Sequence, residues 1–94
     1  MSNALIIFIK NPQKGKVKTR LAKTVGDDAA LEIYMQLLTT TRTLTEKLKN
    51  TSRRLYYSDF IDATDNWVNT LFEKKLQTGK DLGERMFNAF QETF

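Results

Sequence analysis

Residues 4–9 read Ala-Leu-Ile-Ile-Phe-Ile, an unbroken apolar run that is rich in β-branched side chains. Continuous apolarity over this length is typical of a strand buried on both faces, as in a parallel sheet beneath helices. Pro12 has no amide for a sheet ladder and also restricts Asn11, so the strand is expected to end before them. Residues 10–18 then predict a loop, in which Gly15 gives the backbone freedom.

The rest of the chain adds the elements of a βαβ unit. Residues 27–49 carry apolar side chains at steps of three and four, which predicts a long helix with an acidic start and a basic end. Residues 55–57 predict a second strand, parallel to the first. Residues 71–76 predict a third strand, with a helix as the alternative. Residues 59–67 are expected to form one or two helical turns, with their aspartates as a cap and a solvated face.

Asp81 predicts the start of a final helix, because it can cap the helix while Glu84 stands three residues later. The expected apolar face of this helix comprises Leu82, Met86, Ala89, Phe90 and Phe94. The predicted fold class is therefore α/β: a three-layer Rossmann-like fragment, with a βαβ unit plus a C-terminal helix on a mainly parallel sheet. A helix of an α/β chain is normally followed by the strand that it covers, so residues 1–94 are expected to be part of a larger domain.

Composition restricts the chemistry. The chain has 94 residues, of which 40% are hydrophobic and 28% charged, as in an ordinary globular domain. It has no cysteine and no histidine, which excludes disulfides, thiolate or imidazole catalysis, and metal sites built on those residues. No apolar run approaches the roughly 20 residues of a membrane span, so no membrane partner and a cytoplasmic location are expected.

Positive charge is concentrated at the start of the chain. Residues 1–26 hold six basic side chains and no acidic one, whereas the other 68 residues hold nine basic and eleven acidic ones. Closely spaced cations repel one another unless an anion or water screens them. The cluster predicts a binding site for a polyanion, with a solvated basic loop as the alternative. Its members are Lys10, Lys14, Lys16, Lys18, Arg20 and Lys23.

The loop after the first strand has the composition of a phosphate site. Open α/β sheets bind ligands beyond the carboxyl ends of their strands, which is where this loop is expected. Gly15 lets the backbone approach a phosphate, Lys18 supplies a compact charge, and Arg20 offers a bidentate fork. Together they suit a diphosphate and the charge that develops on it as a leaving group. A Walker A loop and the dinucleotide fingerprint are excluded, because the additional glycines are missing. A nucleic-acid patch remains an alternative, which the lack of interleaved aromatic residues disfavours.

Two ordered motifs resemble those of a known family. Residues 10–21 read Lys10-x-Pro12-x-x-Gly15-x-Val17-Lys18-Thr19-Arg20-Leu21, with Gly26 following, and residues 77–86 read Gln77-x-Gly79-x-Asp81-Leu82-Gly83-Glu84-Arg85-Met86. Both are similar to signatures of bacterial small glycosyltransferase-like proteins, which have the nucleotide-diphospho-sugar transferase (GT-A type) fold. The resemblance covers the whole chain, but only the N-terminal half of the family's domain.

The resemblance implies a glycosyltransferase-like enzyme that uses a nucleotide-diphospho-sugar, with this chain as the nucleotide-diphosphate-binding part. It implies that Lys18 and Arg20 also take part in catalysis. Mg²⁺ or Mn²⁺ is expected in the full-length protein, but the acid-bearing element that would hold it is absent from this sequence, so the chain alone is expected to be catalytically incomplete. The implied nucleotide-binding residues are Lys10, Pro12, Gly15, Lys18, Thr19, Arg20, Gly79, Asp81, Leu82 and Gly83.

Several alternatives stay open at this point. A nucleotidyltransferase on the same fold would use a nucleoside triphosphate and release pyrophosphate. A non-enzymatic nucleic-acid binder would use the basic loop. Self-association through an unpaired sheet edge or through the apolar C-terminal helix is a further partner interaction. Asp81 has helix capping as its alternative role, and Arg85 either contacts the substrate or pairs with an acid.

Overall fold

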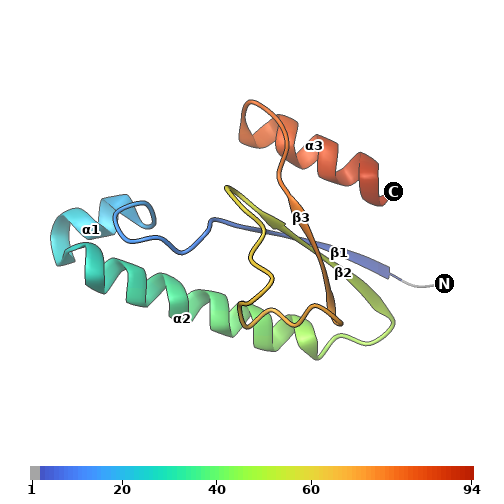
Figure 1. Cartoon of the computed structure of the whole chain (residues 1–94), viewed down its shortest axis with the longest axis horizontal. Helices are drawn as coiled ribbons and strands as arrows, with labels where there is room; N and C mark the ends of the chain where they lie inside the picture. The colour runs from blue at the N-terminus through green and yellow to red at the C-terminus, as the bar shows by residue number, and fades with distance from the viewer. Residues whose placement is uncertain (1–2) are drawn as a thin grey trace. The chain divides into compact units, whose positions relative to one another are not determined.

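A computed structural model describes residues 3–94 (Figure 1). Of these, residues 3–9 and 48–94 form one compact unit, and residues 10–47 form a second. The first unit contains strands β1 (Asn3–Ile9), β2 (Thr51–Tyr57) and β3 (Phe72–Leu76) and helix α3 (Leu82–Thr93). The second contains helices α1 (Thr19–Val25) and α2 (Asp27–Glu46).

The three strands form one parallel sheet in the order β1-β2-β3. Ile7 of β1 stands beside Leu55 of β2, which stands beside Lys74 of β3. The prediction of an α/β chain with a parallel sheet and a C-terminal helix is confirmed. β2 begins four residues earlier than predicted, and the third predicted segment is a strand rather than the alternative helix.

One face of this sheet lies against α3 (Figure 1). The Tyr56 ring packs on Phe8 with 5.4 Å between ring centroids, and its hydroxyl donates to Glu92 Oε2 of α3 at 2.9 Å. Ala89 of α3 is buried, since its small side chain lets the helix approach the sheet. Tyr56 therefore couples the sheet to the helix by both ring packing and a hydrogen bond.

The other face of the sheet carries further large buried residues of this unit. Leu55, Tyr57 and Phe72 are each at most 1% exposed. Trp67, from the segment between β2 and β3, meets the Phe72 ring edge-on with 4.9 Å between centroids. That segment thus contributes to the core although it contains no helix or strand.

The prediction of helical turns over residues 59–67 is wrong, because the segment consists of bends and turns. Asp62 Oδ1 accepts the Thr64 amide at 2.9 Å, and Asp65 Oδ1 accepts the Trp67 amide at 3.1 Å. Aspartates that accept an amide two residues later stabilise turns in competition with helix. The Thr64 amide and hydroxyl bonds lower the pKa of the Asp62 carboxyl.

The second unit contains two helices, and α2 confirms the helix that was predicted to begin at residue 27, although it ends three residues before the predicted end. Gly26, at φ 91°, separates the short α1 from the 20-residue α2. Four threonines of α2 donate their hydroxyls to the carbonyl four residues earlier, which satisfies these polar groups within the helix. Of the apolar residues predicted for one stripe, Ala30 is buried, whereas Ile33, Leu37 and Leu44 are exposed.

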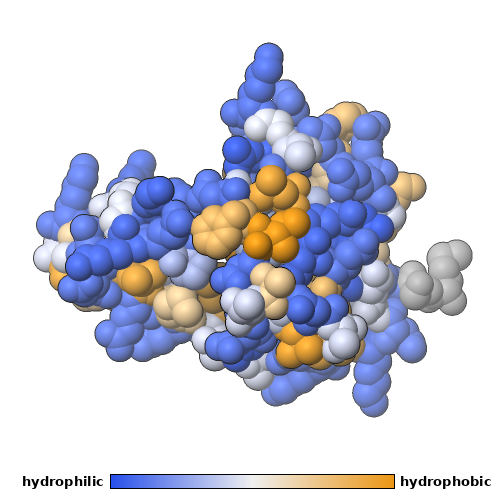
Figure 2. Space-filling model, viewed as in Figure 1, coloured by the Kyte–Doolittle hydropathy of each residue, from blue (hydrophilic) through white to orange (hydrophobic). Residues whose placement is uncertain are grey.

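The visible surface is mostly hydrophilic, and apolar side chains reach it in only a few places (Figure 2). Within residues 3–94, no helix combines the length and the apolarity needed to cross a membrane.

Candidate functional site

The loop that was predicted to bind phosphate begins at Lys10, directly after β1, and is held to α2 by Tyr34. The Tyr34 hydroxyl accepts the Lys10 amide at 2.8 Å and donates to the Lys10 carbonyl at 2.7 Å. Burial raises the pKa of this phenol, so the hydroxyl stays protonated and keeps both bonds. Both backbone groups of Lys10 are thereby fixed, while its side chain is exposed.

The middle of the loop is a tight turn with Gly15 at its third position. The Lys16 amide donates to the Gln13 carbonyl at 3.0 Å, and Gly15 has φ 81°. A turn of this geometry needs a positive φ at that position, which favours glycine. Asn11 and Val17 are buried on either side of the turn, whereas Pro12 is exposed. The loop is therefore anchored at its ends and presents its tip outward.

Lys18 precedes α1 in a left-handed backbone conformation, with φ 49° and ψ 45°. This conformation destabilises a non-glycine residue by roughly 1 kcal/mol or more, because its Cβ comes too close to the following carbonyl oxygen. The Lys18 carbonyl accepts the Ala22 amide at 2.8 Å, which starts α1. Thr19 and Arg20 are the first two residues of the helix, and both are exposed. Lys18 and Arg20 thus stand two residues apart in sequence at the beginning of α1.

The cations of this segment are largely free of internal partners. Lys14 Nζ lies 3.0 Å from Asp28 Oδ1, and the hydrogen bond to Asp28 raises the pKa of this lysine. No carboxylate of residues 3–94 pairs with the other five basic side chains of the segment. These five, all exposed, are Lys10, Lys16, Lys18, Arg20 and Lys23.

The second predicted part of the site follows β3 in the first unit and is organised by Gln77. Its Nε2 donates to the carbonyls of Ile9 at 3.0 Å and Tyr56 at 3.1 Å, close to the carboxyl ends of β1 and β2. Its backbone amide donates to the Tyr57 carbonyl at 2.8 Å. A single side chain therefore joins the ends of two strands to the segment that leaves the third.

Arg85 of α3 holds the same segment from the other side. Its Nε donates to the Gly79 carbonyl at 3.1 Å, and its Nη1 donates to Gln77 Oε1 at 3.3 Å. Neither alternative weighed for Arg85 describes these bonds, because the partners are a carbonyl and an amide. Sequence reasoning missed this role of Gln77 and Arg85, and only their presence in the second motif drew attention to them.

Gly79 lies where no other residue fits without a shift. Its φ is 140°, and a Cβ built on it would stand 2.9 Å from the Arg85 amide nitrogen. The segment from Gln77 to α3 therefore approaches the helix closely, and Asn88 Nδ2 adds a bond to the Thr78 carbonyl at 2.8 Å.

The predicted capping of α3 is confirmed. Asp81 is the N-cap residue, and its Oδ1 accepts the Glu84 amide at 2.8 Å. Leu82 and Gly83 form the start of the helix and are exposed. The atom nearest to a Cβ built on Gly83 is Asp81 Oδ1 at 3.5 Å, an ordinary contact. Nothing in residues 3–94 thus requires a glycine at position 83.

A buried ionic cluster stands on the sheet face opposite α3. Lys74 Nζ lies 2.7 Å from Asp65 Oδ1, and Tyr57 donates its hydroxyl to Asp65 Oδ2. Burial, and secondly the bond to Asp65, raises the pKa of Tyr57. The expectation of a solvated face at Asp65 is wrong, because its carboxylate pairs with Lys74, whose side chain is only 5% exposed. The cluster fixes the segment between β2 and β3.

The described residues do not fit a divalent metal site. No group of three or more acidic side chains within residues 3–94 lies close enough together to hold a metal ion. Mg²⁺ and Mn²⁺ prefer several oxygen ligands, and here the carboxylate of Asp65 already pairs with Lys74.

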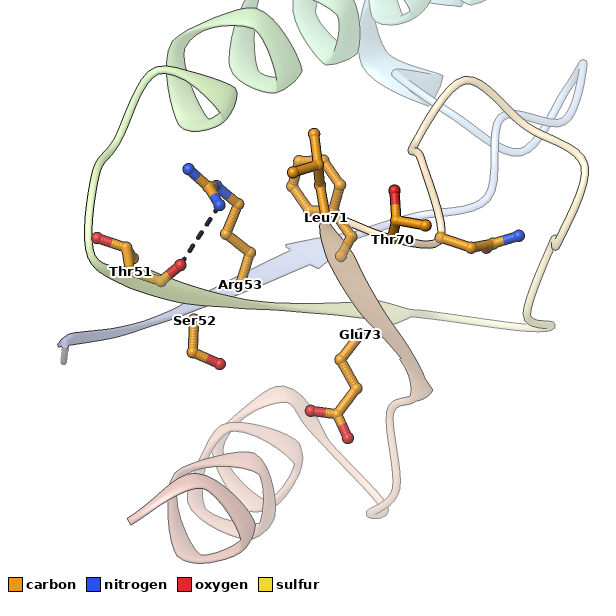
Figure 3. A pocket seen from close by; sticks show the side chains of 8 residues that line it. Thr51, Ser52, Arg53, Thr70, Leu71 and Glu73 are labelled. Atoms are coloured by element: carbon orange, nitrogen blue, oxygen red, sulfur yellow. Dashed lines mark hydrogen bonds between the residues drawn. The ribbon is translucent and has the colours of Figure 1, made fainter.

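A shallow pocket of about 440 Å³ lies at the amino ends of β2 and β3. Arg53 and Leu71 extend to one face of the sheet there, and Ser52 and Glu73 extend to the face of α3 (Figure 3). Arg53 Nη1 donates to the Thr51 carbonyl at 3.3 Å. This is the edge opposite to the carboxyl ends, where ligands of α/β sheets bind, so the pocket is not part of the candidate site.

Comparison with known proteins gives one informative relative. No protein-family model matches the sequence, and no curated protein matches it significantly. A crystal structure from Desulfovibrio desulfuricans G20, provisionally described as a nucleotide-diphospho-sugar transferase, matches with a TM-score of 0.85 and 33% sequence identity. The match covers 100% of this chain and 42% of that chain, so the present sequence spans less than half the length of the relative. Over its whole length, the chain therefore has the α/β fold of part of this nucleotide-diphospho-sugar transferase.

Proposed function

We propose that this chain is the nucleotide-diphosphate-binding part of a glycosyltransferase-like protein that uses a nucleotide-diphospho-sugar. The observation that supports it is the set of five exposed cations around Gly15 and the start of α1 that have no carboxylate partner within residues 3–94. Internal pairing would have neutralised a merely structural cluster, as Asp28 does for Lys14. The similarity to the Desulfovibrio protein points to the same class of ligand.

In this proposal the diphosphate binds beside Lys18 and Arg20. Arg20 offers two parallel N–H donors to phosphate oxygens, and Lys18 adds a compact charge. During transfer, the acceptor hydroxyl oxygen bonds to the anomeric carbon and gives up its proton to water. The bond between the anomeric carbon and the β-phosphate oxygen breaks, and the nucleoside diphosphate leaves with the bonding electrons. Lys18 and Arg20 stabilise the negative charge that grows on the departing oxygen.

The resemblance implies that the second motif borders the base and ribose of a nucleotide. The segment after β3 is rigid, because Gln77 and Arg85 fix it to the strand ends and to α3. Among residues 3–94, no atom stands closer than 3.5 Å to a Cβ built on the helix residue Gly83, and a glycine there costs about 1 kcal/mol relative to alanine. Close approach of a bound nucleotide would account for that cost.

Calorimetric titration with UDP, GDP and CDP, and with their sugar conjugates, tests the proposal. We expect binding of at least one nucleoside diphosphate, and a loss of at least about tenfold in affinity for Lys18→Ala and for Arg20→Ala. Lys49→Ala is the matched control, since it removes one charge from an exposed lysine outside the loop. The proposal fails if no nucleotide binds, or if Lys49→Ala weakens binding as much as Arg20→Ala.

Two further measurements separate the alternatives. Release of pyrophosphate from a nucleoside triphosphate would identify a nucleotidyltransferase instead. Binding of single-stranded nucleic acid with a steep salt dependence, and without competition by a mononucleotide, would identify a nucleic-acid binder.

A further inference from the structure

The peptide group that joins Ile9 to Lys10 is held at both its carbonyl and its amide. The carbonyl, which belongs to Ile9, accepts Gln77 Nε2 at 3.0 Å. The amide, which belongs to Lys10, donates to the Tyr34 hydroxyl at 2.8 Å. The carbonyl and the amide of a trans peptide point in opposite directions, so the two bonds together oppose rotation of the group. β1 ends at Ile9, and the loop with the exposed cations begins at Lys10, so two side chains fix the point where the chain leaves the sheet.

The side-chain amide of Gln77 is committed to this arrangement. Both of its N–H groups are used, on the carbonyls of Ile9 and Tyr56. Its Oε1 accepts Arg85 Nη1 at 3.3 Å. An ionised glutamate would have no donor for the two carbonyls, and a lysine would have no acceptor for Arg85. Gln77 therefore acts on the backbone of its own chain and not on a ligand.

The bonds of Gln77 lie among elements that already pair with one another. β1 pairs with β2, and β2 pairs with β3, which Gln77 directly follows. Ile9 is 5% exposed and Tyr56 is 2% exposed. Buried carbonyls that lose their donor are costly, so without the Gln77 amide the strand end would have to move to find other partners. The Ile9–Lys10 peptide would move with it.

We propose that Gln77 and Tyr34 are positioning residues of the diphosphate site, which set the direction of the loop without touching the ligand. The inference rests on the proposed function, because that function assigns the loop to a diphosphate. The Tyr34 hydroxyl also donates to the Lys10 carbonyl at 2.7 Å, so both backbone groups of the first loop residue are fixed. A loop that is fixed in this way has less conformational freedom to lose when it binds an anion.

Calorimetric titration of the full chain with UDP, GDP and CDP tests the inference on Gln77→Met and Tyr34→Phe. Methionine is as long as glutamine but has no N–H donor, and phenylalanine keeps the ring of Tyr34 without its hydroxyl. We expect each substitution to weaken binding of the nucleoside diphosphate that the wild type binds by at least about fivefold, as a change within a coupled network can do without ligand contact.

Tyr56→Phe is the matched control, since it makes the same chemical change as Tyr34→Phe. It removes the hydrogen bond to Glu92 Oε2 of α3 and leaves the partners of the Ile9–Lys10 peptide in place. This variant should bind like the wild type. Tyr34→Phe removes a single oxygen atom from a half-buried side chain, so it decides the question even if Gln77→Met does not fold.

Hydrogen exchange of the Lys10 amide, followed by NMR without a ligand, separates positioning from general stability. Gln77 makes no bond to this amide, but Gln77→Met should accelerate its exchange by at least about fivefold, because the peptide group loses its second hydrogen bond. Tyr56→Phe should leave the exchange rate unchanged. An unchanged rate in Gln77→Met, or equal rates in the two variants, overturns the inference.

The binding data distinguish failure of the inference from failure of the proposed function. If the wild type binds no nucleoside diphosphate, the proposed function fails and the inference fails with it. If the wild type binds one, and Gln77→Met and Tyr34→Phe bind it equally well or no worse than Tyr56→Phe, only the inference is overturned.

Discussion

Replacing Gly79 with alanine should destabilise the fold through a specific clash. The residue has φ 140°, which costs an L-amino acid about 1–3 kcal/mol. The new Cβ would also stand 2.9 Å from the Arg85 amide nitrogen and 3.1 Å from the Glu84 carbonyl carbon. Both are backbone atoms of α3, so relief requires the segment or the helix to move, at about 1–3 kcal/mol more.

We therefore expect Gly79→Ala to lower the free energy of unfolding by about 3 kcal/mol. For a chain of this size, about 4–8 °C of melting temperature corresponds to 1 kcal/mol, so the midpoint should fall by about 12–24 °C. Urea unfolding and thermal melting, both followed by circular dichroism, measure the change.

Gly26→Ala is the matched control for this substitution. Gly26 also has a positive φ, 91°, but nothing lies within 4 Å of the position of its Cβ. This variant should show only the backbone strain and should retain about 1–3 kcal/mol more stability than Gly79→Ala. If the two variants lose equal stability, or if Gly79→Ala melts within 2 °C of wild type, the close approach of the segment to α3 is refuted.

Three further outcomes are expected. Asp81→Ala should lower the free energy of unfolding in urea by about 1 kcal/mol, because it removes the cap on the Glu84 amide. Asp81→Asn should retain most of this stability, because asparagine also caps helices, and equal losses in the two variants would contradict the capping role. The pKa of Tyr57 is higher in the folded chain than its ordinary value of 10.0, so its contribution to stability is complete below about pH 10 and declines above it. Tyr57→Phe should accordingly flatten the alkaline loss of stability by up to about 1.4 kcal/mol per pH unit, and an unchanged slope would refute the assignment. Gly83→Ala should raise stability by about 0.5–1 kcal/mol while it weakens nucleoside diphosphate binding; a variant that binds as wild type would remove position 83 from the proposed site.

Local patterns predicted the elements well. The apolar run of residues 4–9 and the acidic start of α2 belong to segments whose own composition favours strand or helix, and both elements formed. The Asp81 cap was also predictable, because donor and acceptor lie three residues apart. The start of α2 directly after Gly26 was predicted, whereas residues 47–49, which were expected to continue the helix, lie outside it.

Contacts between distant positions could not be predicted in this way. The Gln77 amide meets Ile9, 68 residues away, and the Tyr34 hydroxyl meets Lys10, 24 residues away. No spacing rule links such pairs, because they meet only in the folded chain. The turns around Asp65 were missed for a related reason: its carboxylate is held by Tyr57 and Lys74, which overrides any local preference for helix.

The backbone of Lys18 has a consequence for selection experiments. A left-handed conformation suits glycine or asparagine better than lysine, so either replacement would make the polypeptide more heat-resistant. A library screened only for thermal tolerance should accordingly enrich Lys18→Gly and Lys18→Asn, whereas one screened on an immobilised nucleoside diphosphate should keep the cation. The two screens would then select different residues at position 18. The difference in melting temperature between the selected variants would measure how much thermal stability a lysine costs at this position.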